Sequence, residues 1–79
     1  MKVTKYFENA VMLKRTYLSV EVCKYVIDHH VRREIQPDGR IRVWGKFKDS
    51  GKYLRVVLLE DGETIHNAFI DRGFKPEVI

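Results

Sequence analysis

The chain has few of the features that mark secreted, membrane-spanning or disulfide-bonded proteins. Cys23 is the only cysteine among 79 residues, which excludes an intrachain disulfide and fits a reducing compartment. No apolar run approaches the roughly 20 residues that a membrane-spanning helix needs. The opening segment, MKVTKYFENA, lacks the apolar stretch of a signal peptide. We therefore expect a cytoplasmic protein without a membrane partner.

Several motifs of catalysis and cofactor binding are also missing. The sequence contains no phosphate-binding glycine loop, nucleophile elbow or helix-turn-helix pattern. A zinc site that combines Cys23 with His29 and His30 is disfavoured, because adjacent histidines lack the usual spacing of zinc ligands. The two histidines fit better at the end of a helix, where a cation complements the helix dipole. We expect neither a metal nor another cofactor.

Positive charge is in excess and unevenly distributed. The net charge is +4, yet residues 31–59 carry eight basic and three acidic side chains, a balance of +5. Residues 60–79 carry two basic and five acidic side chains, a balance of −3. The basic segment favours a polyanion as partner. The alternative is a small basic protein whose charge serves only solubility.

Composition and length predict one folded domain over residues 1–79, since the chain is 44% hydrophobic and contains no repeat or linker. Residues 6–15 suit a first helix, although a buried strand around residues 11–13 is also compatible. The expected buried face of that helix contains Tyr6, Ala10, Leu13 and Tyr17. A second helix is expected over residues 19–29, with Ser19 as its N-cap and Leu18 and Cys23 at the spacing of a hydrophobic staple.

Four strand-like runs follow at residues 31–36, 40–47, 52–60 and 63–70. They are separated by turn signals at residues 37–39, 49–52 and 61–62. These turns predict three hairpins, with the pairs Glu34–Arg42, Arg32–Trp44, Lys48–Tyr53, Trp44–Val57, Val57–His66 and Leu54–Phe69. The sequence thus predicts an α+β fold, in which two N-terminal helices pack on one face of a four-stranded antiparallel β-meander.

The three registers sort the side chains onto two faces of the sheet. The face expected to carry the helices collects Ile35, Ile41, Val43, Phe47, Leu54, Val56, Leu58, Ile65 and Phe69. The opposite face collects Arg32, Glu34, Arg42, Trp44, Lys46, Tyr53, Arg55, Val57 and His66. Arg33 is the misfit on the apolar face, where its long side chain is expected to reach solvent from an edge strand.

The second face mixes cations with aromatic rings, a combination that suits RNA because cations neutralise phosphates and rings stack unpaired bases. His66 is the candidate for proton transfer. Arg42 and Arg55 would stabilise phosphate charge, and Trp44 or Tyr53 would stack a base. The RNA contacts expected from this face also include Arg32 and Lys46. The alternatives remain a solvated sheet face with a Glu34–Arg42 ion pair, and a His66 that is merely hydrogen-bonded to its neighbours.

Three long segments and one short one carry a resemblance to a known family: KRTYLSVEVCKYVI (14–27), QPDGRIRVWGKF (36–47), YLRVVLLEDGETIHNAF (53–69) and Asp71-Arg72. In layout and hairpin pattern they resemble the RelE/ParE toxin superfamily, especially its small BrnT-like branch or a related family of small proteins. The resemblance spans nearly the whole chain. The tryptophan-containing opening of the BrnT-like branch is absent.

In that superfamily, basic residues of the sheet commonly bind and cleave mRNA, and an antitoxin covers the same surface. The resemblance implies that Arg42, Arg55 and His66 are catalytic, with phosphate contacts from Lys14, Arg15 and Arg72. It also implies two partners, RNA that is free or ribosome-bound and a small antitoxin protein. ParE-type members act on gyrase instead, so that target class stays open.

Two hypotheses follow. The first is a metal-independent endoribonuclease that cleaves RNA through a 2′,3′-cyclic phosphate, as the toxin of a toxin–antitoxin pair. The second is a non-catalytic RNA-binding or protein-interaction module that uses the same face.

Overall fold

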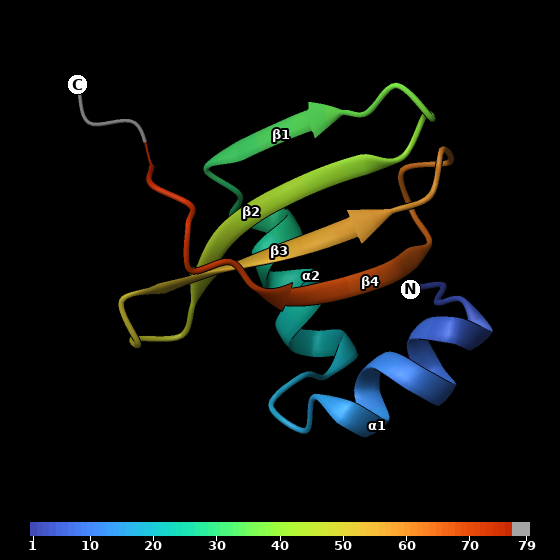
Figure 1. Ribbon diagram of the computed structural model, residues 1–79, viewed down its shortest axis with the longest axis horizontal. Helices are drawn as coiled ribbons and strands as arrows, with labels where there is room; N and C mark the ends of the chain where they lie inside the picture. Colours follow the sequence, from blue (N-terminus) through green and yellow to red (C-terminus); the bar gives the residue numbers. More distant parts are fainter. Residues whose placement is uncertain (77–79) are drawn as a thin grey trace.

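The sheet is a four-stranded antiparallel meander in the order β1-β2-β3-β4. The computed structural model describes residues 1–76. Its elements are η1 (Phe7–Val11), α1 (Met12–Lys14), α2 (Val20–Asp28), β1 (Arg32–Ile35), β2 (Ile41–Phe47), β3 (Lys52–Leu58) and β4 (Ile65–Ile70). In Figure 1, α2 crosses behind the sheet, and α1 lies beside the edge formed by β4. The predicted α+β class and meander are confirmed.

The first helical segment spans nearly the predicted residues but buries a different face. It begins as a π-helix, η1, and its buried side chains are Phe7 and Val11. The expected face is wrong, because Leu13 is 73% exposed and Tyr6 is also exposed. The buried pair Phe7 and Val11 keeps the four-residue spacing of the predicted pair Tyr6 and Ala10 but lies one residue further along the chain. The alternative of a buried strand here is wrong as well.

The second helix follows the predicted pattern closely. The side-chain hydroxyl of Ser19 accepts a hydrogen bond from the backbone N–H of Val22 at 3.1 Å, as an N-cap should. Leu18 and Cys23 are both buried in the core, which agrees with the predicted staple. The helix packs against β2 at Gly45, where an added Cβ would lie 3.0 Å from the backbone oxygen of Val26. Glycine therefore permits the close approach of α2 to the sheet.

The first hairpin has the predicted register, with Glu34 opposite Arg42. The second hairpin is shifted by two residues, so Trp44 lies opposite Arg55 rather than Val57, and Lys46 rather than Lys48 lies opposite Tyr53. The turn begins earlier than predicted, because Lys48 adopts a left-handed conformation with φ 52°. An even shift keeps the alternation of faces along β2 and β3.

The third hairpin contains a β-bulge that the sequence did not reveal. At its base, Leu58 lies opposite Ile65, in the predicted register. Beyond that pair the register shifts by one, and Arg55 lies opposite Phe69. The predicted Val57–His66 and Leu54–Phe69 pairs are therefore wrong. One extra residue on the bulged strand reverses the faces of all residues beyond it.

The reversal changes which β4 side chains enter the core. Ala68 is fully buried, whereas Phe69 is only partly buried and lies beside Arg55 on the other face. Ile35 on β1 is 67% exposed, so the helices do not cover this part of the predicted apolar face. Arg33 on the same strand is exposed, as predicted. The core nevertheless contains most of the predicted set: Ile41, Val43, Phe47, Leu54, Val56, Leu58 and Ile65.

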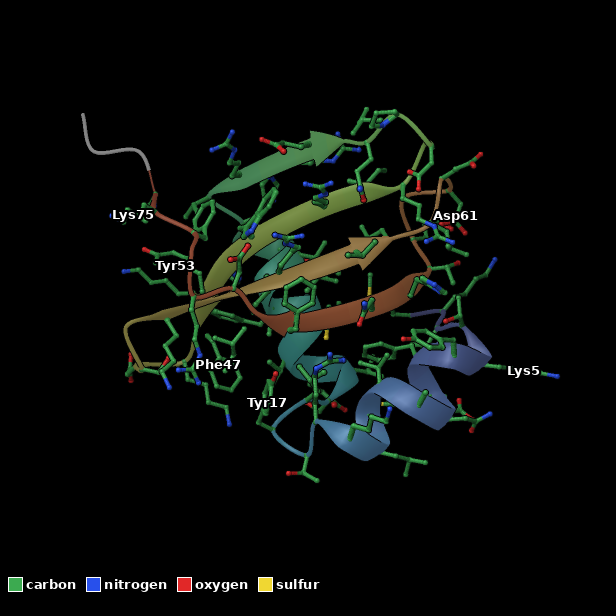
Figure 2. All side chains as sticks on the ribbon, in the orientation of Figure 1. Lys5, Tyr17, Phe47, Tyr53, Asp61 and Lys75 are labelled. Atoms are coloured by element: carbon green, nitrogen blue, oxygen red, sulfur yellow. The ribbon has the colours of Figure 1, made fainter. Side chains whose placement is uncertain are left out.

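Side-chain packing joins the helical segments to the sheet. The rings of Tyr17 and Phe47 meet edge to face, with centroids 5.5 Å apart, and both are labelled in Figure 2. The backbone of Val3 forms an isolated parallel bridge with Ile65, which ties the chain's start to β4. Within residues 1–76, no helix has the length and hydrophobicity needed to cross a bilayer.

Candidate nucleic-acid interface

A basic pocket of about 350 Å³ lies on the sheet face opposite α2. Three predicted site residues, Arg42, Arg55 and His66, line it together. The remaining lining residues are Tyr6, Gln36, Asp38, Arg40, Val57, Asn67 and Phe69. Three guanidinium groups against one carboxylate give this basic pocket a positive electrostatic balance. Its size lies within the range of small-ligand pockets in proteins.

His66 is the extra residue of the β4 bulge, since Val57 pairs with Asn67 and Leu58 pairs with Ile65. Its Nδ1 lies 3.1 Å from the hydroxyl oxygen of Thr4. That hydroxyl also accepts a hydrogen bond from the backbone N–H of Phe7 at 3.0 Å. The contact fixes the imidazole ring from the N-terminal segment.

The environment of His66 favours its neutral form. Partial burial and the positive charge of Arg40 lower the pKa of His66 below its ordinary value of 6.5. The imidazole is consequently unprotonated at neutral pH and available as a proton acceptor. The ring also lies against that of Tyr6, with centroids 5.1 Å apart.

Arg42 is held by the amide of Gln36, the residue that follows β1. With its oxygen toward Arg42, the Gln36 carboxamide accepts hydrogen bonds from Nε and Nη2 of that guanidinium at 2.9 and 2.7 Å. A neutral amide orients Arg42 without cancelling its charge. The predicted alternative partner, Glu34, instead forms an ion pair with Arg32 on its own strand. The alternative of a Glu34–Arg42 ion pair is therefore wrong.

A second pocket, of about 530 Å³, adjoins the first and shares Arg42 and Arg55 with it. We call it the tryptophan pocket. Its other lining residues are Arg32, Glu34, Trp44, Asp71, Gly73, Phe74 and Lys75. Several of these belong to the C-terminal segment, residues 71–76, which crosses the sheet face after β4.

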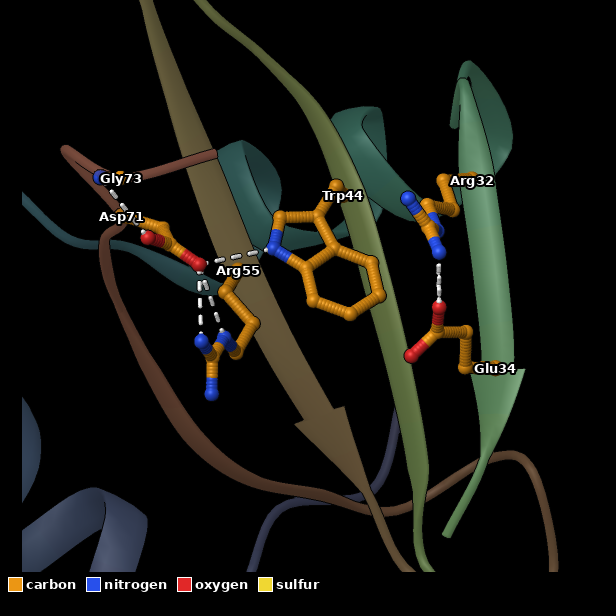
Figure 3. A network of polar contacts seen from close by, with 6 residues as sticks. All are labelled: Arg32, Glu34, Trp44, Arg55, Asp71 and Gly73. Carbon is orange, nitrogen blue, oxygen red and sulfur yellow. Dashed lines mark hydrogen bonds and ion pairs between the residues drawn. The ribbon is translucent and has the colours of Figure 1, made fainter. Parts of the chain in front are cut away.

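Asp71 binds two of the predicted functional residues of the tryptophan pocket, Trp44 and Arg55 (Figure 3). One carboxylate oxygen accepts hydrogen bonds from Nε1 of Trp44 at 3.0 Å and from Nε and Nη2 of Arg55 at 3.1 and 2.8 Å. The other oxygen accepts from the backbone N–H of Gly73 at 3.1 Å. The indole hydrogen bond and the guanidinium lower the pKa of Asp71, so the carboxylate is charged at neutral pH.

Phe74 then covers Trp44. Their rings stack with centroids 5.2 Å apart and an interplanar angle of 12°. Tyr53 contacts the ring of Phe74 at a centroid distance of 5.2 Å. Trp44 is consequently only 4% exposed. The ring of Trp44, which was expected to be open for stacking a base, is covered by the C-terminal segment.

The other predicted contact residues lie around the two pockets or away from them. Arg15 reaches Asn67 with a 3.5 Å hydrogen bond and lies over the ring of Phe69. Arg32 lies over the ring of Trp44, with its guanidinium carbon 5.9 Å from the ring centroid. Lys46 lines a separate groove beside α2. Lys14 and Arg72 are exposed and line neither pocket.

Sequence reasoning missed part of the basic pocket. Arg40 was assigned to no site, although its charge lies close enough to affect His66. Asn67 was missed because the bulge places it beside His66 among the pocket residues. For the tryptophan pocket, the sequence held one usable signal of the covering segment: an Asp and a Phe three residues apart directly after the last strand. Among residues 1–76, no group of three or more His, Cys, Asp or Glu side chains could hold a metal ion.

Comparison with protein-family models, curated protein sequences and solved structures finds no match to this chain.

Proposed function

We propose that this chain binds single-stranded RNA on its sheet face and cleaves it at a phosphate seated in the basic pocket. The observation that carries this proposal is the shared lining of one pocket by Arg40, Arg42, Arg55 and His66, whose pKa is lowered by partial burial and by Arg40. Guanidinium groups bind phosphate oxygens in a forked geometry and stabilise the charge that builds up on a pentavalent phosphorus. A neutral imidazole beside them can act as a general base.

The proposed reaction is a transesterification at phosphorus. His66 takes the proton of the ribose 2′-hydroxyl, whose oxygen then attacks the adjacent phosphorus. The new 2′-oxygen–phosphorus bond forms as the bond to the 5′ oxygen breaks, which leaves a 2′,3′-cyclic phosphate. The departing 5′ oxygen takes a proton from water, and the imidazolium later releases its own proton to solvent. Arg42 and Arg55 hold the non-bridging oxygens throughout.

The resemblance to RelE/ParE toxins extends this proposal to the biological role. In that role the chain is the toxin of a toxin–antitoxin pair, acts in the cytoplasm on free or ribosome-bound RNA, and is silenced by a small protein that covers the basic sheet face. An acidic partner would complement the +5 balance of residues 31–59.

One observation favours the second candidate, an RNA-binding module that does not cleave. Among the residues that line the basic pocket, His66 is the only imidazole, so a second proton-transfer group would have to be the Asp38 carboxyl or the Tyr6 phenol. Ribonucleases of this mechanism benefit from a second proton-transfer group for the leaving oxygen. Binding through the same arginines would need none.

The decisive experiment measures cleavage and binding separately, in the presence of a metal chelator. We expect the purified protein to cut a labelled single-stranded RNA to products that end in a 2′,3′-cyclic phosphate. A 2′-deoxy residue at the cut position should block cleavage. The change His66→Gln should lower the cleavage rate about 10²–10⁴-fold with little change in RNA affinity. His30→Gln, at an exposed histidine after α2, is the matched control.

The outcomes separate the candidates. RNA that is bound but stays intact, with or without ribosomes, favours the non-catalytic module. Failure to bind RNA even at low ionic strength overturns both, and a screen for gyrase inhibition or for a protein ligand would then replace them.

A further inference from the structure

Arg55 lines both pockets, and an aromatic side chain lies on each side of its guanidinium group. Its guanidinium carbon lies 4.8 Å from the ring centroid of Phe69 and 5.4 Å from that of Trp44. On the tryptophan side, its Nε and Nη2 groups are taken by Asp71. A phosphate in the basic pocket and the Asp71 carboxylate therefore share one cation.

The C-terminal segment places two groups on the tryptophan pocket that resemble the parts of a nucleotide. A carboxylate accepts from Arg55 and from the indole N–H of Trp44, as a phosphate oxygen would. An aromatic ring stacks on Trp44 almost in parallel, at 12°, as an unpaired base would. Tyr53 lies against that ring at a tilt of 58°.

We propose that Trp44 and Arg55 form a subsite for one unpaired nucleotide, and that the protein's own Asp71 and Phe74 occupy this subsite until single-stranded RNA displaces them. This proposal rests on the proposed RNA-binding function and adds its regulation. The nucleotide beside the bound phosphate would stack its base on Trp44 in place of Phe74. Its phosphate would replace the Asp71 carboxylate on Arg55.

Release of the segment leaves the core in place. Residues 71–76 belong to no helix or strand, and the segment is held by the side chains of Asp71 and Phe74 and by a 2.9 Å hydrogen bond from the backbone N–H of Asp71 to the carbonyl oxygen of Tyr53. The apolar core that joins α2 to the sheet lies on the opposite face and includes Val43, Leu54 and Val56. Segments with so few buried contacts open at low free-energy cost relative to the whole fold.

Occupancy by the segment lowers the apparent affinity for RNA. The apparent affinity equals the intrinsic affinity multiplied by the fraction of molecules in which the subsite is open. Removal of either internal group should therefore tighten RNA binding. We expect Asp71→Asn and Phe74→Ala each to tighten it by about tenfold, as for a subsite that is open in roughly a tenth of the molecules.

A control with the same change in net charge separates the loss of the Asp71 contact from a general effect of charge on RNA affinity. Glu8→Gln changes the net charge by the same amount as Asp71→Asn, at an exposed residue that lines neither pocket. We expect Glu8→Gln to change RNA affinity by less than about twofold. Phe74→Ala changes no charge and tests stacking by itself.

Trp44 is the only tryptophan of the chain and reports directly on its own environment. Its fluorescence should be shielded from acrylamide in the native protein and exposed in Phe74→Ala. Addition of an oligonucleotide should quench the Trp44 emission, because a base stacks on the indole in place of Phe74. Circular dichroism and thermal melting establish that each variant is folded.

The results distinguish this inference from the proposed function. Folded Asp71→Asn and Phe74→Ala variants that bind RNA no more tightly than the native protein would overturn the subsite, while RNA binding by the native protein would leave the proposed function standing. Absence of RNA binding in all forms would overturn the proposed function. If a variant fails to fold, Trp44 emission of the native protein decides: quenching by bound RNA supports displacement, and unchanged emission on saturation overturns it.

Discussion

The indole N–H of Trp44 donates a 3.0 Å hydrogen bond to the carboxylate of Asp71, 27 residues further along the chain. The pair joins the middle of β2 to the residue that follows β4, across the full width of β3. It exists because the second hairpin is shifted by two residues, which places Trp44 opposite Arg55. Arg55 then completes the network by binding the same carboxylate oxygen. A face that would otherwise expose a tryptophan is closed by this contact.

The core should respond strongly to truncation on β3. Leu58 is 3% exposed, so Leu58→Ala is expected to lower the free energy of unfolding by about 2–5 kcal/mol. Leu13→Ala, the same change at an exposed leucine, should cost less than about 0.5 kcal/mol. Denaturant unfolding of both variants measures the difference. Similar values for the two would mean that the sheet faces are assigned incorrectly.

The close packing of α2 on β2 should be sensitive to a single methyl group. A Cβ at Gly45 would lie 3.0 Å from the Val26 carbonyl oxygen and 3.1 Å from Val26 Cγ1. Gly45→Ala is therefore expected to destabilise the fold by about 1–3 kcal/mol. Gly73→Ala, whose Cβ would meet its nearest neighbour at 3.7 Å, is the control. Equal melting temperatures for the native protein and Gly45→Ala would contradict the helix position.

The thiol of Cys23 should be unreactive towards thiol reagents in the native protein. Burial raises the pKa of its thiol to about 12, and the side chain is fully enclosed. Thiolate is the reactive form, so both its scarcity and its enclosure oppose modification. A disulfide reagent at pH 8 should label the protein slowly without denaturant and completely in denaturant. Rapid labelling under native conditions would mean that α2 does not cover the thiol.

His66 should make stability depend on pH in one defined window. Its pKa is lowered in the folded protein, so the unfolded chain binds more protons between the folded value and 6.5. Stability should be insensitive to His66 above this window and should fall as the pH decreases through it. Denaturation midpoints at several values from pH 7.5 to 5 measure the effect. The decline should be smaller in His66→Gln, and equal declines would contradict the lowered pKa.

A phosphate ligand should reverse this shift. An anion in the basic pocket favours the imidazolium, so the pKa of His66 should rise when RNA binds. Titration of the imidazole by nuclear magnetic resonance, with and without a non-cleavable 2′-deoxy oligonucleotide, tests this directly. An unchanged pKa at saturation would place the phosphate away from His66.

RNA affinity should depend on salt through specific arginines. Each lost phosphate contact flattens the slope of log affinity against log salt concentration by about one unit. Arg42→Ala should produce this change because its guanidinium lines the basic pocket. Arg33→Ala removes an equal charge from the neighbouring strand but lines neither pocket. If both variants flatten the slope equally, the interaction is a diffuse charge effect.

The sequence by itself determined those features that depend on local physics. The cap at Ser19, the apolar spacing of α2 and the turn at residues 37–39 each act over a few residues, and all three agree with the structure. Alternation along β2 and β3 also placed Val43, Leu54 and Val56 correctly in the core. Period-2 alternation survives a register error of two residues, which explains why the faces of the second hairpin were right although its pairs were wrong.

Tertiary structure alone decided the rest. The bulge at His66 depends on how β4 meets β3, since the turn that precedes it has the expected register. That one residue moved Phe69 out of the core and brought Asn67 into the basic pocket beside His66. The burial of Trp44 depends on where residues 71–76 cross the sheet, which no local pattern specifies. Contacts between distant segments have no short-range signature, because their free energy is gained only when the whole sheet has assembled.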